Sequence, residues 1–165
     1  MLLALNLENE PMNKIEPERY EKRGAMLLAG LRQQHSFSNA AETIPKQWHQ
    51  FHALGKINGQ VGSALYGAGC GSSPSGFEYM TGVEVDSFSS LPEKIGKLRI
   101  PKQNYAVFLH NDHISTIQNT WKLILNDWLT RPDVHAVETP NFELYDERFN
   151  SSTGLGAVEI FIAVE

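Results

Sequence analysis

Two glutamates stand within apolar, strand-like segments, and they offer the clearest chemistry in this sequence. Glu159 lies in residues 157–164, and Glu84 lies in residues 77–85. Side chains in a strand alternate between its two faces, so each glutamate points away from the β-branched residues beside it. The face of Glu159 is otherwise apolar and includes Phe161. Because an unpaired carboxylate is rarely buried in such surroundings, we interpret both glutamates as candidate ligand-binding residues.

A shared cleft would explain both glutamates. If a pseudo-two-fold axis relates the two strands, both carboxylates point into one cleft, where burial and mutual repulsion raise their pKa values. A lipophilic cation entering this cleft relieves that cost, and aromatic walls add about 0.5–2 kcal/mol of cation–π attraction per contact. The candidate walls are aromatic or thioether side chains, namely Phe161, Tyr145, Tyr79, Tyr66, Met80, Trp121 and Trp48. The sequence therefore predicts a binding site for hydrophobic, cationic small molecules.

Simpler interpretations of the same residues stay open. A glutamate in a strand is commonly solvated or part of a structural ion pair, and Arg148 or Arg99 is a candidate partner. Trp48 and Trp121 also have the helical spacing that is typical of a buried core face.

Other chemistries have less support. Histidines and an aspartate at metal-like spacing lack an evident complete ligand set: His49 with His52, and His110 with Asp112 and His113. Cys70, the only cysteine, has no identifiable base with an orienting partner. The glycine-rich residues 67–71 precede a strand rather than a helix, which argues against a phosphate site. We therefore expect no metal and no cofactor, and a binding protein rather than an enzyme.

The elements that must position these residues occur twice in the same order. The first copy reads as strand 25–31, helix 43–54 with Thr43 as N-cap, strand 63–67, loop 69–76 and strand 77–85. The second copy reads as strand 104–110, helix 114–129, strand 142–149, turn 150–156 and strand 157–164. The tryptophan and glutamate of each copy have similar separations, 36 residues from Trp48 to Glu84 and 38 from Trp121 to Glu159. The sequence predicts an α+β fold made from a duplicated β-α-β-β unit with pseudo-two-fold symmetry, an antiparallel sheet, two helices and a central ligand cleft.

The bulk composition favours one globular domain. The chain has 165 residues, of which 41% are hydrophobic, and a formal net charge of -5. This charge argues against direct nucleic-acid binding, and no apolar run approaches the roughly 20 residues of a membrane helix. We expect one domain at residues 23–165, with repeats at about 23–90 and 97–165, after an N-terminal arm at residues 1–22. Without a signal peptide, and with a single cysteine, a cytoplasmic location is expected.

These segments resemble the GyrI-like small-molecule-binding domain, the effector-binding domain of AraC-type and MerR-type transcription regulators. The similar stretches are residues 44–51, 77–85, 105–108, 120–129, 142–149 and 158–162, and they extend the match over about residues 23–165. The resemblance implies the duplicated fold and a cleft with an acidic residue that recognises cationic or amphipathic ligands. It places that acid at Glu159, with Glu84 as its counterpart. Ala163 stands where the family usually has proline.

A stand-alone binding module is the form that we expect. The regulators carry a helix-turn-helix ahead of this domain, whereas about 22 residues precede it here. The chain is also similar to free-standing, drug-binding products of integron gene cassettes. Two alternatives stay open: a hydrolase that uses a buried glutamate as general base, and an inhibitor of a protein partner such as gyrase. A homodimer is compatible with each of these functions.

Overall fold

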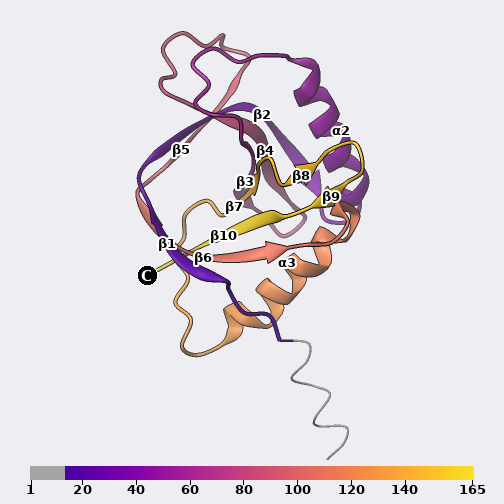
Figure 1. Cartoon of the computed structure of the whole chain (residues 1–165), viewed down its shortest axis with the longest axis vertical. Helices are drawn as coiled ribbons and strands as arrows, with labels where there is room; N and C mark the ends of the chain where they lie inside the picture. The colour runs from indigo at the N-terminus through magenta and orange to yellow at the C-terminus, as the bar shows by residue number, and fades with distance from the viewer. Residues whose placement is uncertain (1–13) are drawn as a thin grey trace, which may run out of the picture.

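A single antiparallel sheet of eight strands organises the protein (Figure 1). The computed structural model describes residues 14–165, so residues 1–13 of the predicted arm lie outside the described residues. The strands of this sheet are β1 (Arg19–Arg23), β2 (Met26–Ser36), β3 (Leu65–Ser72), β4 (Gly76–Val85), β5 (Gly96–Ile100), β6 (Gln103–His110), β7 (Phe142–Tyr145) and β10 (Val158–Val164). A separate small hairpin joins β8 (Phe149–Asn150) to β9 (Leu155–Gly156).

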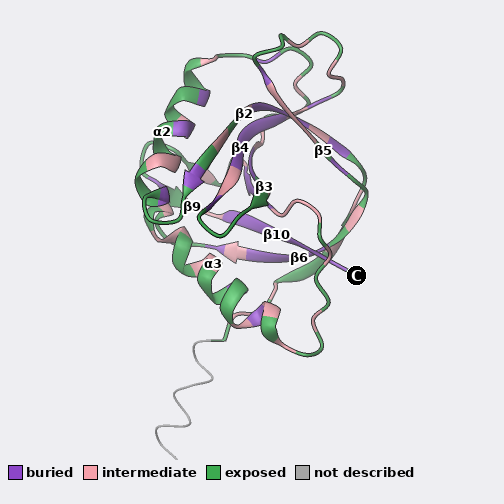
Figure 2. Cartoon of the chain, turned by 180° about the vertical axis from the view of Figure 1, so that it is seen from behind, coloured by how far each residue is buried: buried purple, intermediate pink, exposed green. Residues whose placement is uncertain are grey.

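Within residues 14–165, two α-helices pack on one side of the sheet, one from each repeat. They are α2 (Ala40–Ala53) and α3 (Ile117–Asn126), and the short helices η2 (Ile114–Thr116) and η3 (Trp128–Thr130) flank α3. Their outward faces are largely exposed, whereas the central strands are buried (Figure 2). No helix among residues 14–165 is long and apolar enough to cross a membrane.

The strand order confirms the predicted duplication. The sheet runs β1-β6-β10-β7-β3-β4-β2-β5, and every neighbouring pair is antiparallel. The β-α-β-β unit made by β2, α2, β3 and β4 recurs as β6, α3, β7 and β10. The two units meet where β7 pairs with β3, so the pseudo-two-fold axis passes between these two strands. The predicted α+β class and antiparallel sheet are thereby confirmed.

The edge strands are exchanged between the two units. β1 precedes the first unit in the chain but pairs with β6 of the second, with Arg19 opposite Val107 and Arg23 opposite Gln103. β5 precedes the second unit but pairs with β2 of the first. The sheet therefore begins at Arg19, inside the residues that we predicted to be an arm.

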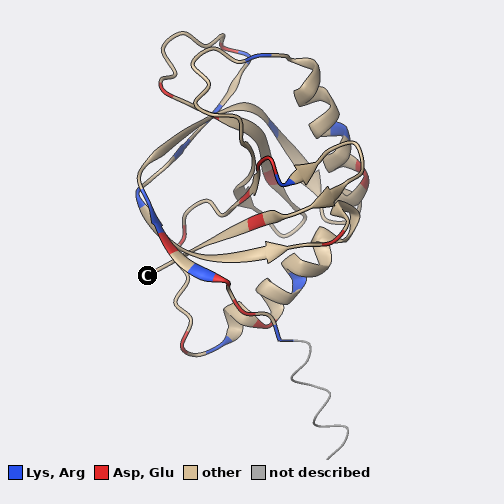
Figure 3. Ribbon diagram, in the orientation of Figure 1, with Lys and Arg blue, Asp and Glu red and all other residues tan. Residues whose placement is uncertain are grey.

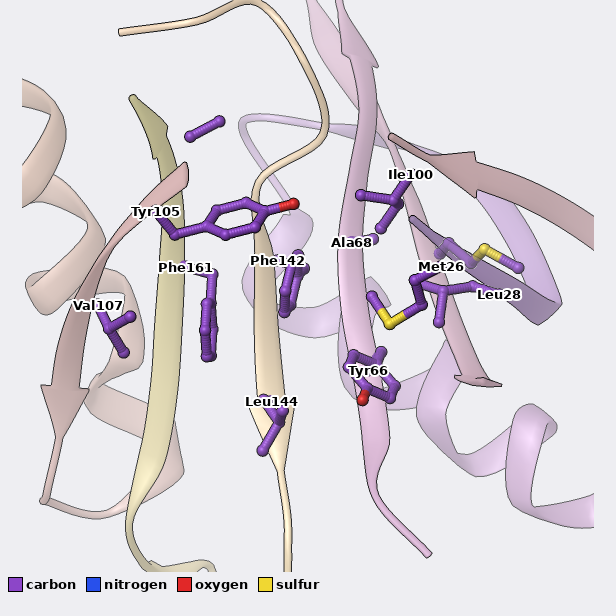
Figure 4. Packing of buried hydrophobic residues seen from close by; sticks show 12 residues of the cluster. Met26, Leu28, Tyr66, Ala68, Ile100, Tyr105, Val107, Phe142, Leu144 and Phe161 are labelled. Atoms are coloured by element: carbon purple, nitrogen blue, oxygen red, sulfur yellow. The ribbon is translucent and has the colours of Figure 1, made fainter. Parts of the chain in front are cut away.

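Apolar side chains fill both faces of the sheet. Towards α2, Phe51 packs with Ala29, Val83 and Val85, and towards α3, Ile124 packs with Phe108, Ile160 and Ile162. The face away from the helices is concave and carries a third core cluster (Figure 4), made of Met26, Leu28, Tyr66, Ala68, Met80, Ile100, Tyr105, Val107, Phe142, Leu144, Phe161 and Ala163. This face, where we predicted the ligand cleft, is therefore occupied by the protein's own core.

Several element boundaries differ from the prediction. Asn39, not Thr43, is the N-cap of α2, and Pro45 lies inside the helix. β3 continues to Ser72 through much of the predicted loop, with an irregular register against β4 between Gly69 and Ser72. The predicted helix 114–129 is divided into η2, α3 and η3.

Candidate functional site

The nine residues predicted to bind ligand are divided between the two faces of the sheet. The concave face carries Glu159, Glu84, Phe161, Tyr66 and Met80. The helix side carries Tyr79, Tyr145, Trp48 and Trp121. Because neighbouring residues of a strand point to opposite faces, Tyr79 and Met80 cannot line the same site.

On the concave face, Glu159 is held in an ion-pair network. Its side chain is 7% exposed, and its Oε2 accepts a hydrogen bond from Nη1 of Arg19 at 2.5 Å. Nη2 of Arg148 lies 3.2 Å from its Oε1. Burial by itself would raise the pKa of Glu159, but the hydrogen bond and charge of Arg19, together with Arg148, outweigh it and hold the pKa below its ordinary value. The expectation of a raised pKa at Glu159 was therefore wrong.

The second predicted acid, Glu84, does not meet Glu159. Glu84 is half-buried on β4, and two strands, β7 and β3, lie between β4 and β10. Three strand spacings correspond to about 14 Å along the sheet, so the predicted mutual repulsion is absent. Arg99, the other candidate ion-pair partner, instead lies over the ring of Phe88, with its Cζ 5.0 Å from the centroid.

Charged residues lie along β1, the strand at this edge of the sheet (Figure 3). Its inward-facing residues form a row in which Glu21 accepts hydrogen bonds from Arg19 at 3.0 Å and Arg23 at 3.5 Å. The Cζ of Arg23 lies 5.0 Å from the ring centroid of Phe161. The Phe161 ring is stacked on that of Phe142, 4.6 Å away (Figure 4). Arg19, Glu21, Arg23 and Glu159 are therefore paired with one another or stacked on rings.

On the helix side, a different acid is surrounded by aromatic groups. Glu143 of β7 is only 6% exposed. Its Oε1 accepts hydrogen bonds from the hydroxyls of Tyr79 at 2.7 Å and Tyr145 at 2.8 Å. Its Oε2 accepts one from the indole Nε1 of Trp121 at 2.7 Å. Residues from β4, β7 and α3 thus converge on one buried carboxylate.

Trp48 completes this arrangement from the other helix. Its ring lies edge-on to Tyr145, with 5.1 Å between the ring centroids, and Tyr145 is in turn edge-on to Phe149 at 5.2 Å. The two tryptophans that match between the repeats therefore approach the same place from α2 and α3. Both are half-buried, so their rings form the outer wall of the site. We call Glu143, Tyr79, Tyr145, Trp48 and Trp121 the carboxylate-aromatic site.

Burial governs the ionisation of this site. It raises the pKa of Glu143, although the hydrogen bonds from Tyr79, Trp121 and Tyr145 act in the opposite direction, as does His110 in its protonated form. Burial and the adjacent carboxylate also raise the pKa values of Tyr79 and Tyr145 well above the ordinary value. Both phenols therefore stay protonated at neutral pH and serve as hydrogen-bond donors.

The residue directly across from Glu143 leaves room for it. Gly67 of β3 pairs with Glu143 of β7, next to the pseudo-two-fold axis. A Cβ atom at Gly67 would lie 1.9 Å from the hydroxyl oxygen of Tyr79 and 2.7 Å from Oε1 of Glu143. The two repeats therefore contribute unequally, because one provides the carboxylate and the other provides a residue without a side chain.

Sequence reasoning missed Glu143 as a site residue, although it lies in the stretch 142–149 that resembles the family. The signal was present in the alternation of β7, where Phe142 and Leu144 share one face and Glu143 and Tyr145 share the other. An acid and a phenol on one face of a short apolar strand indicate a buried polar pair. Which face lies beneath the helices depends on long-range pairing, which the local pattern does not contain.

The other sequence candidates stay apart from this site. Among residues 14–165, no group of three or more histidine, cysteine, aspartate or glutamate side chains is placed to hold a metal ion. Burial raises the pKa of the Cys70 thiol to about 11, so it is a poor nucleophile at neutral pH. Two surface hollows, of about 360 and 270 Å³, lie on the outer face of α3 and beside β5.

Known proteins share this architecture. SAV2435, whose structure was solved bound to tetraphenylphosphonium, superposes with a TM-score of 0.70 at 18% identity, covering 89% of this chain and 93% of that chain. The integron cassette protein VCH_CASS2 of Vibrio cholerae gives a TM-score of 0.66 at 17% identity, covering 92% of this chain and 98% of that chain. At these identities the likeness establishes the fold alone.

Sequence comparison adds the family. The transcriptional regulator BrlR of Pseudomonas aeruginosa is 30% identical over 137 residues, which cover 79% of this chain and 48% of BrlR. The chain thus spans about half the length of this curated relative. The model of the GyrI-like small-molecule-binding domain matches residues 19–165, which include the exchanged strand β1 and the carboxylate-aromatic site. The chain therefore belongs to the family of GyrI-like small-molecule-binding domains.

Proposed function

We propose that this domain binds hydrophobic cations at the carboxylate-aromatic site, with Glu143 as the counter-charge. One observation carries the proposal: Glu143 is buried, and its three hydrogen-bond donors are all neutral groups, two phenols and an indole. The ion pairs within residues 14–165 involve Glu159, Glu21, Glu78, Glu16, Asp127 and Asp146, but not Glu143.

A buried carboxylate without a cationic partner favours a cationic ligand. Ionisation of Glu143 is opposed by its burial, and a cation placed beside it would restore the balance of charge. The faces of Trp48 and Trp121 would add cation–π attraction of about 0.5–2 kcal/mol each. The solved complex of SAV2435 with tetraphenylphosphonium shows that this fold accommodates a lipophilic cation in another protein.

Ligand entry requires the aromatic wall to move. Trp121 donates its indole N–H to Glu143, so a cation must displace or share this bond to reach the carboxylate. Trp48 has no such bond to Glu143, and its edge-on contact with Tyr145 is adjustable. Opening by rotation of these half-buried indoles exposes the acid without breaking the sheet.

The test compares a cation with a neutral molecule of similar shape. Tryptophan fluorescence or calorimetric titrations would use tetraphenylphosphonium and triphenylphosphine oxide. Glu143→Gln keeps the size of the side chain and its acceptor oxygen but removes the charge. We expect cation affinity to fall at least about tenfold, while affinity for the neutral molecule changes less than about threefold. Equal weakening of both ligands would sink the role of Glu143.

Glu159→Gln provides the matched variant on the opposite face. It removes an equally buried carboxylate that already has two arginine partners. The proposal expects cation affinity within about twofold of wild type in this variant. Loss of cation binding in Glu159→Gln but not in Glu143→Gln would contradict the role of Glu143 and favour the site that the sequence predicted on the concave face.

A second candidate function is hydrolysis. It is favoured by the raised pKa of Glu143, because a carboxyl group that titrates nearer to neutrality is an effective general acid or base. The hydroxyls of Tyr79 and Tyr145 would then orient that group. Release of p-nitrophenol from hydrophobic p-nitrophenyl esters, abolished in Glu143→Gln, would support this function. Unchanged turnover in the variant would exclude Glu143 as the acting group.

A further inference from the structure

A buried histidine stands at the end of the first strand of each repeat, outside the carboxylate-aromatic site. His35 is the penultimate residue of β2 and is 5% exposed; His110 is the last residue of β6 and is 3% exposed. These strands are equivalent in the duplicated unit. The histidines are 75 residues apart and the helix tryptophans 73 residues apart, so the two histidines occupy equivalent positions of the repeats.

In the first repeat, His35 bonds α2 at two places. Its Nε2 lies 2.5 Å from Oε1 of Gln47, and its Nδ1 lies 2.7 Å from the hydroxyl of Thr43. Gln47 is fully buried, and its Nε2 donates to the carbonyl oxygens of Leu31 and Tyr79 at 3.0 and 2.9 Å. Because the amide nitrogen of Gln47 donates, its oxygen must accept from His35 Nε2–H. Nδ1 of the neutral ring then accepts from Thr43.

In the second repeat, His110 bonds α3 in the same tautomer. Its Nε2 donates to the carbonyl oxygen of His113 at 3.1 Å, because a carbonyl oxygen can only accept. Its Nδ1 therefore accepts from the hydroxyl of Thr120 at 2.7 Å. The hydroxyl oxygen of Thr116 also lies 3.5 Å from Nε2 of His110. Each histidine thus has its Nδ1 2.7 Å from the hydroxyl of a helix threonine.

The bonded helix positions correspond between the repeats. Thr43 and Gln47 precede Trp48 by five and one residues, and Thr116 and Thr120 precede Trp121 by the same numbers. Residues four apart share one face of a helix, so each histidine holds the helix along the face next to its tryptophan. A rotation of about 10° moves a side-chain tip about 6 Å from the helix axis by about 1 Å. That shift is enough to break the 2.7 Å bond from Trp121 to Glu143.

We propose that His35 and His110 are positioning residues that fix the rotation of α2 and α3 and thereby set the two tryptophans of the ligand site. This inference rests on the proposed function for its effect on binding. The two histidines act unequally, because Trp121 donates a hydrogen bond to the carboxylate whereas Trp48 has none to it and packs edge-on against Tyr145. His110, acting through Thr120, therefore controls whether the indole N–H of Trp121 is hydrogen-bonded to Glu143 in the free protein.

The first test needs no ligand. Thr120→Val keeps the branched shape and removes the hydroxyl, and Thr120→Ser restores a hydroxyl. Nitrogen-15 NMR resolves the indole N–H signals of Trp48, Trp121 and Trp128, assigned with tryptophan-to-phenylalanine variants. We expect Thr120→Val to shift the Trp121 signal and speed its hydrogen exchange, Thr120→Ser to reverse both, and the Trp128 signal to stay in place. An unchanged Trp121 signal in folded Thr120→Val would overturn the proposal.

The second test measures tetraphenylphosphonium affinity. We expect a three- to tenfold loss in Thr120→Val, because a displaced Trp121 no longer places its ring face beside the cation, with recovery to within about twofold in Thr120→Ser and a smaller loss in Thr43→Val. Thr139→Val is the matched control, because no side-chain hydrogen bond joins Thr139 to the rest of residues 14–165. Wild-type protein that does not bind tetraphenylphosphonium would defeat the proposed function, and the indole signal would still decide the positioning role. Equal tetraphenylphosphonium affinity in wild type and Thr120→Val would defeat the positioning role and leave the proposed cation site intact.

Discussion

The two buried glutamates, Glu143 and Glu159, differ in the groups that neutralise them. Glu159 has two arginines within 3.2 Å, whereas Glu143 has only phenol and indole donors. Burial raises the pKa of Glu143, and the arginines lower that of Glu159. The pKa values of these two glutamates are therefore shifted in opposite directions, so their effects can be told apart by varying the pH.

Cation binding should depend on pH through Glu143. A bound cation favours the ionised carboxylate, so affinity for tetraphenylphosphonium rises as pH increases above the ordinary glutamate value of 4.5 and levels off once Glu143 is ionised in the free protein. Titrations between pH 5 and about 8 measure this rise. Glu143→Gln should bind weakly with no slope. A slope that persists in the variant would assign it to another group.

Stability should also rise with pH, through Glu159, although the pKa of Glu159 is shifted in the opposite direction to that of Glu143. The pKa of Glu159 is lowered on folding, so its contribution is present above the ordinary value of 4.5 and is lost as pH falls through the folded value. Because its arginine partners are about two-fifths exposed, we expect Glu159→Gln to lose about 1–2 kcal/mol at neutral pH. Urea unfolding at pH 7 and pH 4 should show a smaller difference in the variant than in wild type. An equal difference in both proteins would contradict this account.

Gly67 should be intolerant of even a methyl group. Alanine there would meet the Tyr79 hydroxyl at 1.9 Å, so Tyr79 must leave Glu143 or β3 must shift. We expect Gly67→Ala to cost about 1–3 kcal/mol of stability and to weaken cation binding. Gly69→Ala, on the same strand, is the control, because the nearest atom would lie 3.9 Å away. Equal melting temperatures and affinities for the two variants would disprove the close approach.

At the scale of elements, α2 and α3 contribute different chemistry to a site that looks symmetric in sequence. Trp121→Phe removes a hydrogen-bond donor from Glu143, whereas Trp48→Phe removes none from it. We expect Trp121→Phe to raise the pKa of Glu143 further, because a hydrogen bond to the ionised form is lost. The midpoint of the affinity-versus-pH curve should therefore move to higher pH in Trp121→Phe and stay in place in Trp48→Phe. Equal midpoints in the two variants would contradict this assignment.

The sequence predicted those elements whose pattern is local. The alternation of Val83 and Val85, and of Ile160 and Ile162, correctly indicated β4 and β10, and Trp48 and Trp121 correctly indicated two equivalent helices. β1 and β5 were missed because each is a five-residue, partly charged strand on the sheet edge, defined by its pairing partner rather than by its own pattern.

The site was half predictable for the same reason. Periodicity separates the two faces of a strand, but it does not say which face a helix covers. An acid within an apolar strand therefore indicated Glu159 and not Glu143. The ion-pair partners of Glu159, Arg19 and Arg148, come from distant segments that its local pattern does not reveal. Only the pairing of β7 with β3 brings Glu143 next to Gly67 and beneath both tryptophans.

At the scale of the whole molecule, exchange of β1 and β5 joins the repeats into one cooperative unit. Each repeat relies on an edge strand from the segment preceding the other, so neither has a complete sheet alone. We expect unfolding in urea to be two-state, with coincident transitions in tryptophan fluorescence and far-ultraviolet circular dichroism. A fragment of residues 23–90 should stay unfolded. Two separate transitions would show that the repeats fold independently.

The pairing of Glu143 with Gly67 has one more consequence. The duplicated frame is nearly symmetric, but the carboxylate of the carboxylate-aromatic site lies to one side of the axis, on β7. A ligand bound as proposed would therefore meet a carboxylate towards the second repeat and an uncharged residue towards the first. An elongated ligand with one charged end would then bind in a single direction. The difference at one matched pair of positions therefore makes the two halves of the carboxylate-aromatic site inequivalent.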